Sequence, residues 1–245
     1  NSFDDDVIEL FIKNNKYDLI AYGSIVTHYK WMKWLTNTIK KYHPETHTVV
    51  GNSVGGSCYE VFMKNCKADV VIIGEGELTT LDVLNAAKNK SSFEQIEGIV
   101  YRNNKNEIIK NPPRQGEPNI DKFPIIKWHK YFDVKRYLKG SSGLSNGVSD
   151  LSSIIAFPLS TARGCAFRCS FCHFVYWDDI YRAKSPARII EEIKYLVDKY
   201  NANFFAFWDD LSFAGLTQVE RLCDAILESG IKIKWSAAIR SDLLG

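Results

Sequence analysis

The chain has 245 residues, enough for one large domain or two modest ones, and 45% of them are hydrophobic while 24% are charged. This balance is typical of a soluble globular protein with a buried core. The 31 basic and 29 acidic residues are well mixed, so the sequence predicts no basic surface for nucleic acid. No apolar run approaches the roughly 20 residues that cross a bilayer, and the first residues are acidic where a signal peptide is basic. We therefore expect no membrane partner and a cytoplasmic location.

Helices and strands alternate in the first part of the chain. Apolar residues between charged ones predict helices at about 3–16, 29–42, 58–66 and 79–88. Short apolar runs that end in small or polar residues predict strands at 17–23, 48–51 and 69–73. Alternation at this spacing predicts a parallel, doubly wound sheet.

A different pattern follows, and then a second alternation. Residues 96–110 surround a polar turn and predict a β-hairpin, which precedes a linker rich in proline, glycine and charge at 111–124. From Ile154 onward we expect strands at about 154–161, 203–208 and 231–238, and helices at 186–200 and 217–229. Three such units are too few to close a barrel, so we expect a fragment of a longer enzyme.

Three cysteines, Cys165, Cys169 and Cys172, stand at C-x3-C-x2-C spacing directly after the first strand of this second alternation. The spacing brings three thiolates together on one loop, which suits an iron–sulfur cluster held through three of its four irons. The fourth iron then stays open to a substrate or cofactor. The remaining cysteines are scattered, and we interpret them as ordinary buried thiols: Cys58, Cys66 and Cys223.

Zinc and disulfide chemistry are the alternatives for this loop. Zinc in proteins takes four ligands, mostly in two separated pairs, and the only nearby fourth candidate is His173, directly after Cys172. A neighbour in sequence is poorly placed to complete that tetrahedron. A disulfide is the weaker alternative, because three clustered cysteines are odd in number.

The cysteine loop resembles that of the radical SAM enzymes, a resemblance strengthened by the aromatic Phe171 just before the third cysteine. In that family the cysteines hold a 4Fe–4S cluster, whose open iron chelates S-adenosylmethionine. One electron from the cluster then cleaves this cofactor to a 5′-deoxyadenosyl radical. The resemblance implies that Phe171 lies near the adenosyl group.

Three further residues are implied as contacts of S-adenosylmethionine. Asp209 ends a strand that resembles the family's second barrel strand, whose polar end approaches the cofactor. Ser236 and Arg240 lie on the third strand and beyond it, where an arginine can pair with the cofactor carboxylate. Arg163 and Arg168 would place positive charge beside an anionic cluster, with surface solvation as the alternative for Arg168.

Residues 17–88 resemble the cobalamin-binding domain that precedes the radical SAM domain in the cobalamin-dependent subclass. The matching runs are 18–24, 49–53 and 69–77. The implied cobalamin contacts are Ser24, Gly51, Ser53, Ser57, Gly74, Glu75 and Gly76. Tight turns of any such sheet would use the same small residues.

Two departures from the cobalamin pattern stand out. A Gly-Gly pair of that family is Gly51-Asn52 here, and the D-x-H-x-x-G loop that supplies a cobalt-ligating histidine in some cobalamin domains is absent. We interpret His28, in a strand-to-helix loop, as a solvated residue rather than a cobalt ligand.

Together the two resemblances imply an α/β chain of three parts. An N-terminally incomplete, doubly wound Rossmann-like cobalamin-binding domain covers 1–95, a hairpin and linker cover 96–153, and a C-terminally truncated radical SAM domain, a partial (β/α) barrel, covers 154–245. The expected cofactors are a 4Fe–4S cluster, S-adenosylmethionine and cobalamin. The expected partners are a small-molecule or peptide substrate and a reductase or flavodoxin-type electron donor.

The expected reaction is radical methyl transfer to an unactivated carbon. Two alternatives stay open. One is a methylthiotransferase-like or cyclase-like radical SAM enzyme without bound cobalamin. The other is a non-catalytic binding module stabilised by zinc or a cluster.

Overall fold

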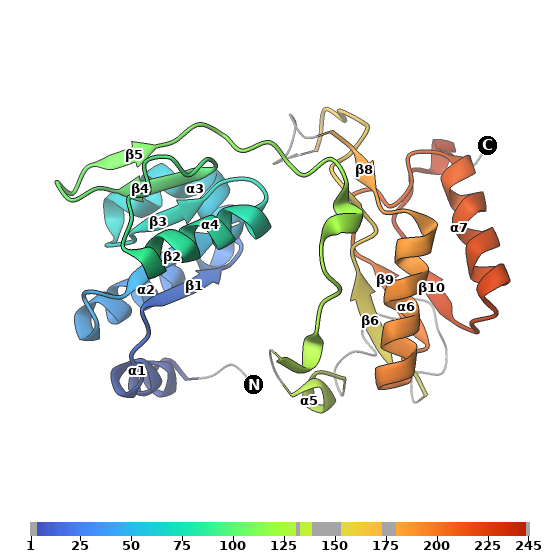
Figure 1. The fold of residues 1–245 in the computed structure, drawn as a ribbon, viewed down its shortest axis with the longest axis horizontal. Helices are drawn as coiled ribbons and strands as arrows, with labels where there is room; N and C mark the ends of the chain where they lie inside the picture. The colour runs from blue at the N-terminus through green and yellow to red at the C-terminus, as the bar shows by residue number, and fades with distance from the viewer. Residues whose placement is uncertain (1–3, 131–132, 139–152, 173–179, 244–245) are drawn as a thin grey trace. The chain divides into compact units, whose positions relative to one another are not determined.

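The computed structural model describes residues 4–130, 133–138, 153–172 and 180–243. The chain separates into two compact units, Asn1–Gly116 and Glu117–Gly245, which are described one at a time (Figure 1). In the described residues, no helix combines the length and the apolar character that crossing a bilayer requires. The two units are defined only by how the chain packs. The domain boundaries that we expected at 95 and 153 therefore stay predictions.

The first unit is built on a five-stranded mixed sheet. Its strands follow chain order: β1 (Leu19–Gly23), β2 (His47–Gly51), β3 (Val70–Ile72), β4 (Ile99–Arg102) and β5 (Ile108–Lys110). The first three are parallel, and β4 and β5 are antiparallel to their neighbours. The predicted hairpin at 96–110 is therefore present, and it extends the sheet that we expected to be purely parallel.

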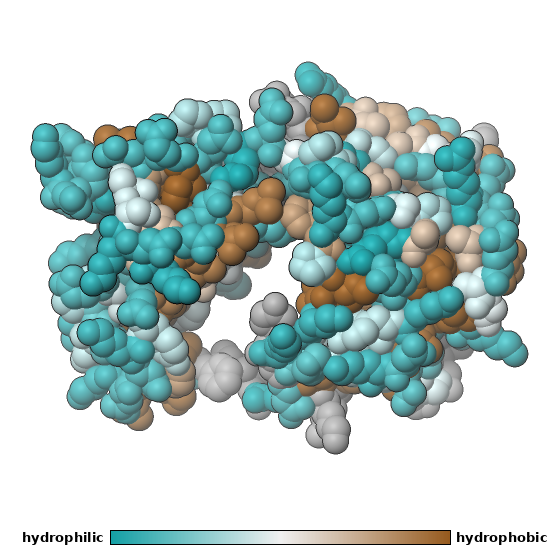
Figure 2. Space-filling model, viewed as in Figure 1, coloured by the Kyte–Doolittle hydropathy of each residue, from teal (hydrophilic) through white to brown (hydrophobic). Residues whose placement is uncertain are grey.

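Helices cover both faces of this sheet: α1 (Asp5–Asn14), α2 (Tyr29–Tyr42), α3 (Asn52–Asn65) and α4 (Gly76–Asn89). Successive strand residues point to opposite faces. Val50 accordingly packs in one core with Met32 of α2 and Phe62 of α3, while Val49 packs in another with Val83 of α4. On its outer side α4 exposes Leu78, Leu81 and Leu84, which form the brown row over that helix in Figure 2.

The helix that we expected at 58–66 begins at Asn52 and is kinked at Cys58. Two glycines, Gly55 and Gly56, weaken the helical signal at its start. Packing explains the first of them, because a Cβ on Gly55 would lie 3.1 Å from the carbonyl oxygen of Val50 and from Val71 Cγ1. The first turn of α3 can approach the sheet only through a residue without a side chain.

The second unit holds three parallel strands in the order β10 (Lys234–Ser236), β9 (Phe204–Phe207) and β6 (Ala156–Leu159). Helices α6 (Pro186–Tyr200) and α7 (Leu216–Ser229) connect them and pack Ile193 and Leu222 against Phe205. The bounds of α6 match the prediction because Ser185 caps it, accepting from Arg188 N, and Pro186 stands in its first turn. Shorter elements are η1 (Val26–His28), η2 (Ile120–Lys122), η3 (Trp128–Lys130), α5 (Val134–Leu138), β7 (Ala162–Arg163), β8 (Arg182–Ala183) and η5 (Ser241–Leu243).

Both units are thus α/β, as predicted. Among the described strands of the first sheet, the order shows no reversal of the kind that a doubly wound sheet has. In the second unit the three strands form an open sheet. The Rossmann-like and barrel assignments stay predictions. Because parallel strands end at the same edge, each unit gathers the residues after its strands on one side.

Candidate functional site

The cysteine loop of the second unit is closed at its base by a short ladder. β7 and β8 pair antiparallel, with Ala162 opposite Ala183 and Arg163 opposite Arg182. Lys184 N continues the ladder by donating to Thr161 O at 2.8 Å. Backbone hydrogen bonds within the protein thereby hold the two ends of the loop side by side.

Within this loop the three cysteines differ in exposure. Cys165 and Cys169 are half-buried and Cys172 is exposed, with its N–H donating to Cys169 O at 3.0 Å. Across the described residues, no three histidine, cysteine or acidic side chains are gathered closely enough to hold a metal ion. His173, the zinc candidate, lies outside the described residues. Three accessible thiols on one anchored loop are nonetheless the donor set that an iron–sulfur cluster requires.

Asp209 fastens the start of this loop to the neighbouring strand. Its Oδ1 accepts from the N–H groups of Thr161 at 2.8 Å and Ala162 at 3.1 Å, and its Oδ2 accepts from Thr161 Oγ1 at 2.6 Å. The register of the two parallel strands explains why Asp209 lies next to Thr161. Leu159 pairs with Phe207, so the residues two places further along each parallel strand lie opposite each other. In the structure, the carboxylate that we expected to contact S-adenosylmethionine holds the start of the cysteine loop.

Arg240 joins the third strand's end to the cysteines. Its Nη1 donates to Cys169 Sγ at 3.3 Å, and its guanidinium lies 4.0 Å from the centroid of the Phe167 ring. Its Nε and Nη2 donate to the two carboxylate oxygens of Asp242 at 2.9 and 2.6 Å. This pairing raises the pKa of Arg240 and lowers that of Asp242. The guanidinium thereby ties the chain after the third strand to the middle cysteine of the loop.

The remaining predicted residues of the second unit lie in different surroundings. Ser236 is half-buried at the end of β10, opposite Ala206 of β9. Phe171 is 90% exposed, so it does not pack on the described residues. Arg163 lies with its guanidinium 4.6 Å from the centroid of the Phe123 ring.

Sequence reasoning missed Thr161, Asp242 and a buried charge cluster beside the loop. In that cluster Lys184 donates to both oxygens of Glu192 at 2.8 and 2.9 Å, while Arg188 lies within 3.4 Å of the same carboxylate. Asp242 could have been found as an acid two residues from Arg240. Thr161 carries no local signal, because its partner is 48 residues away.

In the first unit, the predicted cobalamin residues gather at the ends of the parallel strands. Ser24 follows β1, Gly51 ends β2, and Gly74 follows β3 with φ of 82°. Ser53 and Ser57 lie in the first turns of α3, while Glu75 and Gly76 begin α4. The strand ends thus bring most of this set to one edge of the sheet.

The backbone at this edge is open. A Cβ placed on Gly51 or Gly74 would meet nothing within 4 Å. Asn52, where the cobalamin pattern has glycine, adopts a φ of 61°, and asparagine tolerates this left-handed conformation better than most residues. In the segment after β1, Ile25 and Val26 are 53% and 52% exposed. Open backbone and exposed apolar side chains at one edge fit a large flat ring such as a corrin.

Comparison with known proteins places these features in context. Residues 159–238 match the family model of the radical SAM superfamily. An anaerobic magnesium-protoporphyrin IX monomethyl ester cyclase of Rubrivivax gelatinosus is 23% identical over 100% of this chain and 43% of its own length. A cytidylyl-2-hydroxyethylphosphonate methyltransferase of Streptomyces wedmorensis is 25% identical over 93% of this chain and 46% of its own length. An uncharacterized methyltransferase of Pyrococcus horikoshii is 28% identical over 74% and 37%. The chain spans less than half the length of these curated relatives.

Two solved structures share the fold. OxsB, a cobalamin-dependent S-adenosylmethionine radical enzyme with aqua-cobalamin and S-adenosylmethionine bound, matches 94% of this chain and 31% of its own with a TM-score of 0.71 and 18% identity. TsrM from Kitasatospora setae, a radical S-adenosylmethionine methyltransferase with cobalamin and a [4Fe-4S] cluster bound, matches 91% and 43% with a TM-score of 0.67 and 13% identity.

Proposed function

This chain contains a radical SAM domain at residues 159–238 and is part of a radical SAM enzyme, and from that premise we propose a cobalamin-dependent radical methyltransferase. The protein would cleave S-adenosylmethionine reductively at a 4Fe–4S cluster and transfer a methyl group to an unactivated carbon. The carrying observation is the anchored loop with Cys165, Cys169 and Cys172, at whose middle cysteine a guanidinium donates to the sulfur.

When bound, the cluster supplies the electron that generates the 5′-deoxyadenosyl radical, and cobalamin supplies the methyl group. The three cysteine thiolates would hold the cluster. Asp209 fixes the start of their loop through Thr161 and Ala162. Arg240 places a positive charge and a hydrogen bond at Cys169, which offsets the negative charge that thiolates bring to a cluster.

The proposed contacts with S-adenosylmethionine are Phe171, Asp209, Ser236 and Arg240. Arg240 presents the donor geometry that a carboxylate needs, because it already binds the Asp242 carboxylate through two nitrogens. The methionine carboxylate would compete for, or share, this guanidinium. Ser236 lies at the carboxyl end of its strand, where ligands of parallel sheets bind.

Cobalamin would lie at the strand ends of the first unit, near Ser24, Gly51, Ser53, Ser57, Gly74, Glu75 and Gly76. The open glycines and exposed apolar residues there support this assignment. The names of the solved structures, one cobalamin-dependent and one a methyltransferase with cobalamin, support it as well. The substrate would be a small molecule or peptide, the electron donor a reductase or flavodoxin, and the location the cytoplasm.

A radical cyclase or methylthiotransferase that lacks cobalamin is the second candidate. The cyclase relative, whose match covers 100% of this chain, supports the cyclase chemistry of this candidate. A putative methylthiotransferase of Methanocaldococcus jannaschii is also 22% identical over 76% of this chain. Retention of cobalamin separates this candidate from the first.

The test is anaerobic reconstitution of the full-length protein with iron, sulfide and hydroxocobalamin, followed by an assay for 5′-deoxyadenosine from S-adenosylmethionine under reductant. We expect the nucleoside, retained cobalamin and loss of the nucleoside in Cys165→Ala. Cys223→Ala, the same change in α7, is the matched control and should keep activity. The nucleoside without cobalamin would favour the second candidate, and bound zinc with neither product would overturn both.

A further inference from the structure

A histidine in the segment between β1 and α2 is held by one of the proposed cobalamin residues. Ser24 Oγ lies 2.7 Å from His28 Nδ1. His28 is the last residue of η1, directly before α2, and its side chain makes no capping bond to that helix. Within the parts of the chain that the structure describes, Nε2 has no hydrogen-bond partner. The ring is therefore oriented through one nitrogen and open at the other.

This arrangement is the one that metal-binding histidines use. Such a histidine donates from its second ring nitrogen to an oxygen, which fixes the tautomer and the direction of the ring. When Nδ1–H donates to Ser24 Oγ, the lone pair of Nε2 is free for a metal. The hydroxyl can reverse its role, so the same contact serves the unliganded protein.

The surroundings of His28 fit a corrin better than a hydrated ion. Ile25 and Val26 lie between Ser24 and His28 in the sequence, and they are 53% and 52% exposed. No carboxylate hydrogen-bonds or pairs with the ring among the described residues, and carboxylates are the usual companions of a hard cation. A cobalt atom that arrives with four equatorial nitrogens of its own needs only one more ligand from the protein.

We propose that His28 is an axial cobalt ligand, binding through Nε2, and that Ser24 is its positioning residue. The proposal rests on the proposed cobalamin dependence and deepens it. It also replaces the interpretation of His28 as a solvated residue, which the missing D-x-H-x-x-G loop had favoured. The Ser24 contact would orient the His28 ring for this role.

The test is electron paramagnetic resonance of the full-length protein loaded with cobalamin and reduced to Co(II). A nitrogen ligand splits the cobalt lines into triplets when it is nitrogen-14 and into doublets when it is nitrogen-15. We expect protein labelled with nitrogen-15 histidine to convert the triplets to doublets while the cobalamin is unlabelled. The label needs no substitution, so the result does not depend on the stability of a variant.

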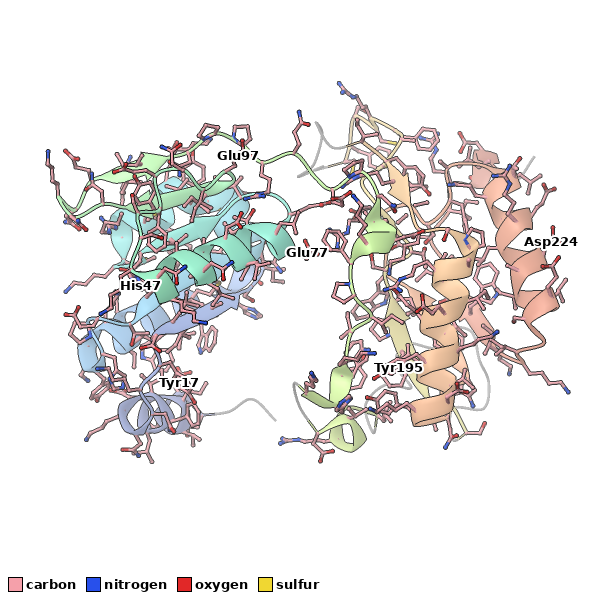
Figure 3. All side chains as sticks on the ribbon, viewed as in Figure 1. Tyr17, His47, Glu77, Glu97, Tyr195 and Asp224 are labelled. Carbon is pink, nitrogen blue, oxygen red and sulfur yellow. The ribbon has the colours of Figure 1, made fainter. Side chains whose placement is uncertain are left out.

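Variants then assign the signal to one residue. His28→Ala should abolish the label-dependent splitting, and Ser24→Ala should weaken cobalamin binding by about 10-fold or more, the usual effect of losing such a partner. The matched control is His47→Gln, because His47, which is labelled in Figure 3, lies at the start of β2, whereas the proposed site follows the end of the parallel strand β1. If the protein retains cobalamin but the splitting does not change with the label, the ligand assignment is wrong and the proposed function is unaffected. Failure to retain cobalamin would overturn both.

Discussion

Asp209 is the side chain whose replacement most directly probes the cysteine loop. Asp209→Ala removes three hydrogen bonds at once. Thr161 and Ala162 are 2% and 3% exposed, so two buried N–H groups would lose their acceptor, at about 1–3 kcal/mol each. Because Asp209 itself is half-buried and water can replace part of the loss, we expect the loop base to open about 3 kcal/mol more easily.

Asp209→Asn is the matched comparison. Its Oδ1 can still accept from both N–H groups, while its amide donates to Thr161 Oγ1, so the geometry survives and only the charge is lost. Charge-assisted bonds are roughly twice as strong as neutral ones, which leaves a cost of about 1 kcal/mol.

The assay is hydrogen exchange of the 161–163 amides in the protein without cofactors, together with iron bound per chain after reconstitution. A loss of about 3 kcal/mol corresponds to roughly 100-fold faster exchange in Asp209→Ala, against several-fold in Asp209→Asn. Iron retention should fall in the same order. Exchange unchanged in Asp209→Ala would refute the anchoring argument. A large rise in the KM for S-adenosylmethionine in Asp209→Asn, with normal exchange, would assign the carboxylate to the cofactor as well.

Three other predictions concern Arg240, its partner Asp242, and Asn52 in the first unit. Arg240→Leu should lower the cluster's midpoint potential, because the variant loses a positive charge and a hydrogen bond at Cys169 that favour the more negative, reduced cluster; an unchanged potential in a redox titration would contradict this. The pKa of Asp242 is lowered by Arg240, so their pairing stabilises the fold above the ordinary aspartate range and is lost only as the pH falls through the lowered value. Carboxyl titration by NMR should show this pKa rising in Arg240→Leu and not in Arg221→Leu. Asn52→Ala should destabilise the protein by about 1 kcal/mol in denaturant unfolding, because alanine disfavours a φ of 61°, whereas Asn52→Gly should cost little.

The elements with strong local signals could be predicted closely. The bounds of α2 match the prediction because Met32, Leu35 and Ile39 repeat at helical spacing and are buried. For α6 the capping serine and the first-turn proline mark the start. The three cysteines can be recognised as a candidate cluster site from their spacing alone.

Features that depend on distant partners could not be predicted. We predicted that α3 begins later than it does, because no local pattern in the sequence shows that the backbone at Gly55 packs against Val50. The anchoring role of Asp209 depends on the register of β6 and β9, which brings together residues 48 apart. The contact between Arg240 and Cys169 spans 71 residues and follows from strand order rather than from any local pattern.

The pairing of β7 with β8 also affects how far the length of the cysteine loop can vary. Ala162 pairs directly with Ala183, so this pairing does not itself depend on one particular length of chain between them. Doubling the length of a closed loop costs only about 0.6 kcal/mol of entropy. We therefore expect that insertions between Gly164 and Tyr181 can alter the surroundings of the cysteines at little entropic cost while the pairing of β7 with β8 remains.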